Sequence, residues 1–91
     1  MGKGEISWNR QNEEGEKLLV YARLFGNKWT FYRRRKRYDQ WQEVEEPPID
    51  DWLELLDGVE RRVARRMMPP DEIQRVRRLI REQYPDWKPA G

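Results

Sequence analysis

The 91-residue sequence contains no cysteine and no histidine. Without cysteine there is no disulfide, no zinc–thiolate site and no thiol nucleophile. Without histidine the chain lacks the commonest general base and the commonest metal ligand, which excludes Ser/His/Asp and Cys/His catalysis. We therefore expect a binding protein that is not an enzyme and that needs neither a metal nor a cofactor.

Long apolar runs are also missing. The N-terminal stretch MGKGEISW is polar, so we expect no signal peptide and no membrane span, and a cytoplasmic location. Charged residues make up 40% of the chain, yet the net charge is only +2, so any basic surface must come from local segregation of charge. Five tryptophans, four tyrosines and two phenylalanines indicate a folded centre.

The stretch KLLVYARLFGNKWTFYRRRK has the clearest local pattern. Two β-rich runs flank Gly26-Asn27, a pair that suits a two-residue hairpin turn of type I′ or II′. With this turn, Phe25 faces Lys28 and Tyr21 faces Tyr32. Because side chains alternate along a strand, the hairpin has a mainly apolar face, which we expect to be the core, and a second face rich in tyrosine and arginine.

The stretch YDQWQEVEE predicts a third antiparallel strand, which the prolines at 47–48 end. Two registers remain open. One places Glu43 opposite Arg33 and turns Trp41 toward the core, and a shift by one residue turns Val44 there instead. In either register we expect the glutamates of EVEE to lie beside much of the arginine run and to neutralise part of it.

The rest of the chain switches to a helical period. Residues 50–68 carry one apolar stripe, formed by Trp52, Leu56, Val59, Val63 and Met67. A second helix follows over 69–84, and the short MMPP link predicts a helical hairpin. The predicted fold class is α+β, a three-stranded antiparallel sheet (β-β-β-α-α) covered on one face by the C-terminal helical hairpin. We predict a flexible N-terminal segment at 1–15, with a short edge strand at 5–9 left open, a single small domain at 16–85 and an extended tail at 86–91.

Two groups of basic residues are candidate binding sites. Aromatic rings stack on nucleobases and guanidinium groups contact phosphates, which makes the second face of the hairpin and its adjoining turn the first candidate. Its residues are Tyr21, Arg23, Tyr32, Arg34, Lys36 and Arg37. Like charges four residues apart in the first helix form a secondary basic patch, whose residues are Arg61, Arg62, Arg65 and Arg66. The plainer interpretations are a solvated sheet face and a helix end whose charges suit the helix dipole.

Our hypothesis is a small binding domain for single-stranded nucleic acid, either RNA or single-stranded DNA. The element order resembles that of small single-stranded nucleic-acid-binding domains in which a curved antiparallel sheet packs under a helix, although no residue-level motif is shared. The alternative is a protein–protein interaction module or a small homodimer. The sequence leaves open the identity of the partner, the oligomeric state and whether residues 1–15 become ordered on binding.

Overall fold

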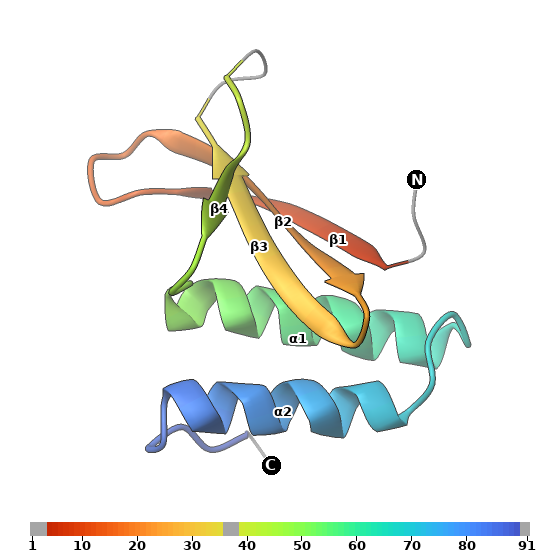
Figure 1. Ribbon diagram of the computed structural model, residues 1–91. Helices are drawn as coiled ribbons and strands as arrows, with labels where there is room; N and C mark the ends of the chain where they lie inside the picture. The colour runs from red at the N-terminus through yellow and green to blue at the C-terminus, as the bar shows by residue number, and fades with distance from the viewer. Residues whose placement is uncertain (1–3, 36–38, 90–91) are drawn as a thin grey trace. The chain divides into compact units, whose positions relative to one another are not determined.

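The computed structural model describes residues 4–35 and 39–89 (Figure 1). Its elements are, in chain order, β1 (Glu5–Gln11), β2 (Lys17–Phe25), β3 (Lys28–Arg34), β4 (Gln42–Val44), α1 (Ile49–Ala64) and α2 (Asp71–Gln83). The predicted antiparallel sheet followed by two helices is confirmed, but the sheet has four strands, in the order β1-β2-β3-β4, rather than three. The chain forms two compact units, residues 1–47 with the sheet and residues 48–91 with the helices. The single domain predicted over 16–85 stays a prediction.

Strand β1 is the extra strand, and it is the edge strand that the sequence left open at 5–9, extended to Gln11. It pairs antiparallel with β2, with Ile6 opposite Ala22 and Trp8 opposite Val20. Ile6 is only 3% exposed, whereas Ser7 is exposed. The short alternation ISW therefore follows the period of a half-buried strand, and burial of its apolar members stabilises a segment that is otherwise polar.

The β2–β3 hairpin has the predicted register. Phe25 lies opposite Lys28 and Tyr21 opposite Tyr32. Both turn residues have positive φ, 58° at Gly26 and 64° at Asn27, which is the type I′ geometry. One face of the sheet holds the buried apolar side chains of this unit, namely Ile6, Leu18, Val20, Ala22, Trp29 and Phe31. We call this the inner face, and the opposite side the outer face.

Strand β4 settles the open register of the predicted third strand. Val44 lies opposite Phe31 on the inner face, and Glu43 lies opposite Tyr32 on the outer face. The predicted neutralisation of the arginine run by EVEE is wrong for Arg33, Arg34 and Arg35, while Lys36 and Arg37 lie outside the described residues. No ion pair joins Arg33, Arg34 or Arg35 to a glutamate of EVEE within the described parts of the chain. The ladder ends at Val44, so the two later glutamates lie beyond the strand, and the register puts Gln42 opposite Arg33.

The helical unit is an antiparallel pair in which α1 packs against α2 (Figure 1). Its buried apolar residues are Trp52, Leu55, Leu56, Val59, Met68, Val76 and Ile80. The prediction that Met67 continues the stripe of α1 is wrong, because this side chain is 60% exposed while Met68 is 9% exposed. Helix α1 ends at Ala64, and Arg66 has φ 61°, so the chain leaves the helical path before Met67. Neither described helix is long and apolar enough to cross a membrane.

Candidate nucleic-acid interface

Three aromatic rings form a cluster on the outer face of the sheet. The rings of Tyr21 and Tyr32 are stacked, with centroids 4.8 Å apart and an interplanar angle of 21°. Trp41, which precedes β4, meets Tyr21 edge-on, with centroids 4.7 Å apart at 88°. Trp41 is 37% exposed, so this cluster lies at the surface and is not part of the core. We call these three rings the aromatic cluster.

Arg34 fixes one border of the aromatic cluster. Its guanidinium carbon lies 4.3 Å from the centroid of the Trp41 ring, within the range of a cation–π interaction. Its Nη1 donates a long hydrogen bond, 3.5 Å, to the backbone carbonyl of Asp39. Its Nε is buried and has no hydrogen-bond partner among the described residues. Arg34 is thus held beside the rings, and part of its donor capacity is unused.

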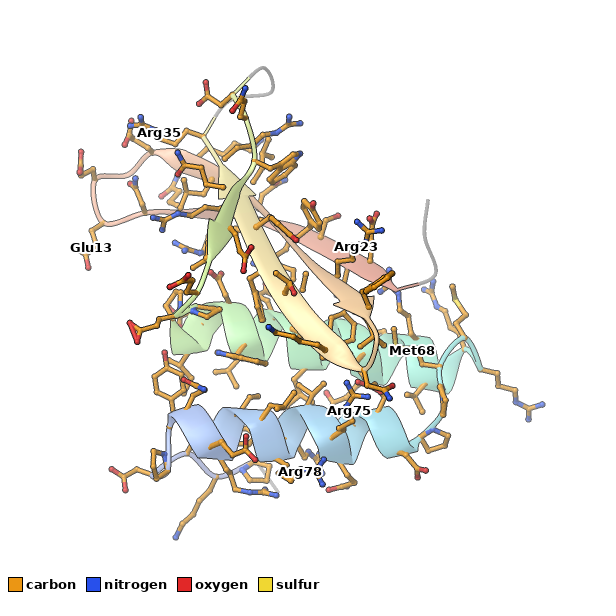
Figure 2. All side chains as sticks on the ribbon, viewed as in Figure 1. Glu13, Arg23, Arg35, Met68, Arg75 and Arg78 are labelled. Carbon is orange, nitrogen blue, oxygen red and sulfur yellow. The ribbon has the colours of Figure 1, made fainter. Side chains whose placement is uncertain are left out.

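Arg23 and Phe25 lie at the other end of the outer face, near the β2–β3 turn. The guanidinium carbon of Arg23 is 5.8 Å from the centroid of the Phe25 ring, and Figure 2 labels this arginine on the sheet. Phe25 is 75% exposed. These two residues, with Lys28, Thr30 and Tyr32, line a shallow hollow of about 340 Å³. The hollow brings two aromatic rings and two cations together.

Burial raises the pKa of the Tyr21 phenol above its usual value of 10.0, and the nearby Tyr32 and Glu5 raise it further, while Arg23 opposes the shift. The phenol is therefore a neutral hydrogen-bond donor at neutral pH. The outer face carries Lys17, Arg23, Lys28 and Arg34 as cations against Glu5 and Glu43 as anions, so its local charge is positive.

Four of the predicted site residues, Tyr21, Arg23, Tyr32 and Arg34, share the outer face. The other two, Lys36 and Arg37, lie outside the described residues. Sequence reasoning left the place of Trp41 open, and this ring joins the site. The spacing left two choices, because residues 41 and 44 differ in parity, and the observed register with Val44 on the inner face turns Trp41 outward.

Two of the four residues of the secondary basic patch have partners within their own helix. Arg61 makes an ion pair with Asp57, with 3.0 Å between Nη2 and Oδ2, as expected for opposite charges four residues apart. Arg62 donates from Nη1 to the backbone carbonyl of Gly58 at 3.5 Å. Arg65 and Arg66 follow the last residue of α1 and are exposed. Contacts within α1 thus explain the positions of Arg61 and Arg62, and Arg65 is the C-cap residue of the helix.

No protein-family model matches this chain, and neither does any curated protein or solved structure. Within residues 4–35 and 39–89, no three acidic, histidine or cysteine side chains are grouped so that they could hold a metal ion. The outer face, with its aromatic cluster and flanking arginines, is therefore the basis for assigning a function.

Proposed function

We propose that this protein binds single-stranded nucleic acid, RNA or single-stranded DNA, on the outer face of its sheet. The observation that carries the proposal is the aromatic cluster of Tyr21, Tyr32 and Trp41, which lies at the surface with a guanidinium at each end. Exposed rings on a sheet stack with nucleobases, and flanking arginines contact phosphates. In this proposal Arg34 and Arg23 supply the phosphate contacts.

The chemistry of the rings favours a single strand over a duplex. The bases of a duplex are stacked on one another and do not offer their faces to a protein, whereas unpaired bases do. Stacking reads no hydrogen-bond pattern, so we expect weak sequence preference. The hollow beside Phe25 and Tyr32 extends the stacking surface toward the β2–β3 turn.

Fluorescence anisotropy with labelled mixed-sequence oligonucleotides tests the proposal. We expect single-stranded DNA or RNA to bind at about 50 mM salt and markedly more weakly at about 200 mM, because each neutralised phosphate releases counterions. A duplex of matched sequence is the control and should bind less tightly. If no single strand binds above background at the lower salt concentration, the proposal is wrong.

Self-association through the same rings is the competing outcome, and the solution mass distinguishes it. Sedimentation in the titration buffer should show a monomer, in which no second copy covers Tyr21 and Tyr32. A stable dimer that covers these two rings would contradict the proposal, because the stacking surface would then be occupied by protein.

A further inference from the structure

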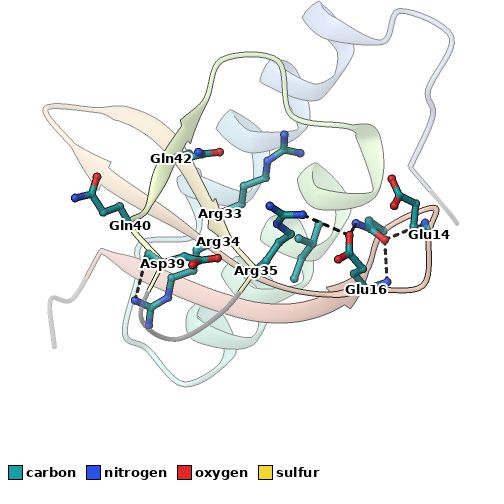
Figure 3. Close-up of a pocket in the computed structure, with 10 residues that line it drawn as sticks. Glu14, Glu16, Arg33, Arg34, Arg35, Asp39, Gln40 and Gln42 are labelled. Atoms are coloured by element: carbon teal, nitrogen blue, oxygen red, sulfur yellow. Dashed lines mark hydrogen bonds and ion pairs between the residues drawn. The ribbon is translucent and has the colours of Figure 1, made fainter.

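A second feature lies at the end of β3, remote from the Gly26-Asn27 turn. It is a pocket of about 580 Å³, drawn in close-up in Figure 3. Strand β3 and the residue after it contribute three arginines, and the β1–β2 loop and β4 contribute polar side chains. The lining residues that matter here are Arg33, Arg34, Arg35, Asn12, Glu16 and Gln42. We call this the arginine pocket.

Arg33 brings to the arginine pocket a positive charge that has no ion-pair partner among the described residues. Its cross-strand neighbours are Val20 and Gln42, both uncharged. Its side chain is exposed, and it makes no ion pair with any residue that the structure describes. Figure 3 shows the guanidinium groups of Arg33 and Arg35 directed to the same side of β3. The two groups can therefore approach one anion together.

Arg35 makes a weak ion pair with Glu16 that another anion can replace. Its Nη1 lies 3.7 Å from Oε1 of Glu16, and the two side chains are 64% and 46% exposed. Ion pairs this long and this exposed are weak. The same Glu16 oxygen also accepts a hydrogen bond of 3.1 Å from Nδ2 of Asn12, so this carboxylate keeps a partner if Arg35 turns away from it. A more strongly charged anion can thus take the place of Glu16 on Arg35.

The wall opposite the arginines is an ordered turn. Oδ1 of Asn12 accepts hydrogen bonds from the backbone N–H groups of Glu14 and Glu16, both at 2.9 Å. Gly15 allows the turn with φ +81°. Glu14, Glu16 and Asp39 also line the pocket and balance its three arginines, so negative charge faces anything that passes beyond the arginines. The pocket therefore suits one compact anion and disfavours a polyanionic backbone running through it.

We propose that the arginine pocket binds a phosphate monoester. A monoester carries about two negative charges at neutral pH and presents three terminal oxygens, whereas an internal phosphodiester carries one charge. Paired guanidinium groups match this geometry. The monoester can be the terminal phosphate of a strand bound on the outer face, a source that rests on the proposed function, or that of a free nucleotide.

Anisotropy titrations of one short single strand, prepared with a hydroxyl or a phosphate at each end in turn, separate these sources. We expect one terminal phosphate to tighten binding about three- to tenfold, a range typical of a partly exposed charge-assisted contact. In the R33Q/R35Q variant the ratio between phosphorylated and hydroxyl-ended strands should fall to about one. The matched control R78Q/R81Q removes two exposed arginines from α2 and should keep the ratio. The ratio is the readout, because a general loss of charge lowers both affinities together.

A second measurement does not depend on strand binding. Amide NMR signals of residues 12–16 and 33–35 should shift saturably with inorganic phosphate or a mononucleotide, compared with chloride at the same ionic strength. A saturable shift without any strand binding would identify the free phosphate compound as the ligand and would count only against the proposed function. If neither phosphate compound shifts these signals and neither terminal phosphate changes the affinity, the pocket is not a phosphate site.

Discussion

The guanidinium carbon of Arg34 lies 4.3 Å from the centroid of the Trp41 ring, so a residue at the end of β3 holds a ring that comes just before β4. The same ring meets Tyr21 edge-on. Cation–π contacts contribute about 0.5–1 kcal/mol at exposed sites. This contact therefore helps to hold Trp41 beside the two tyrosines.

Replacing Trp41 with alanine should weaken binding of single-stranded nucleic acid by about 1–3 kcal/mol, the usual contribution of a stacking ring. The free energy of unfolding should also fall, by about 1–2 kcal/mol, because the chain loses the contacts of this ring with Arg34 and Tyr21. Anisotropy and urea denaturation measure the two effects. Trp87→Ala, in the helical unit, is the control and should leave the affinity unchanged. Equal losses of affinity in both variants would contradict the proposed site.

Replacing Arg23 with glutamine should lower the salt dependence of binding. Each phosphate neutralised on a single strand contributes about 0.7 to the slope of log K against log salt, so the slope should fall by about that amount. The measurement is a set of titrations at several salt concentrations. Arg78→Gln in α2 is the matched control, since it removes the same charge away from the sheet. An unchanged slope in the Arg23 variant would show that this guanidinium does not contact phosphate.

The raised pKa of Tyr21 predicts a dependence of stability on alkaline pH. The folded state holds the Tyr21 proton more tightly than the unfolded state does. The associated stabilisation is complete below a pH of about 10, the unfolded value, and is lost as the pH rises through the higher folded pKa. Urea denaturation of the wild type and Tyr21→Phe should show a smaller alkaline loss in the variant. A matching loss in both proteins would mean that other groups cause it.

The isoleucine of β1 tests whether the N-terminal segment belongs to the sheet. Ile6 is 3% exposed, and truncation of such a side chain to alanine lowers the free energy of unfolding by about 2–5 kcal/mol. Ser7→Ala, one residue along on the outer face, should change it by less than about 0.5 kcal/mol. Urea denaturation compares the two variants. If Ile6→Ala is as mild as Ser7→Ala, the segment contributes nothing to the sheet's stability.

The two adjacent methionines after α1 provide a similarly matched pair. Met68 is 9% exposed and Met67 is 60% exposed. Met68→Ala should lower the free energy of unfolding by about 2 kcal/mol or more, whereas Met67→Ala should cost less than about 0.5 kcal/mol. Thermal or urea denaturation measures which of the two variants loses more stability. The reverse order would mean that α1 continues past Arg66 in solution, as the helical period of the sequence predicts.

Much of the fold follows from local patterns. The Gly26-Asn27 turn, the register from Phe25 opposite Lys28 to Tyr21 opposite Tyr32, and both helices were predictable, because turn chemistry and periodicity act over a few residues. Four site residues follow from the hairpin register alone. What remained open depends on pairing between segments, which local patterns do not determine.

Two differences between prediction and structure depend on such pairing, and a third comes from a backbone turn at the end of α1. The β1 strand has only Ile6 and Trp8 as apolar residues, and their pairing with β2 outweighs the polar composition of the segment. The place of Trp41 depends on a shift of one residue in β4, and either register is compatible with the sequence. Met68 is buried in place of Met67 because the backbone adopts a left-handed conformation at Arg66. This conformation is uncommon for a residue other than glycine, so the sequence does not predict it.

The two-residue length of the β2–β3 turn has a consequence for how this chain can change. Because side chains alternate, one added residue in the turn would exchange the two faces of β3, sending Phe31 to solvent and Tyr32 toward the interior. Substitutions on the outer face can alter the proposed binding surface without touching the interior. An insertion at Gly26-Asn27 would disturb recognition and folding at once, so we expect ligand preference to evolve here through point changes while the turn keeps its length.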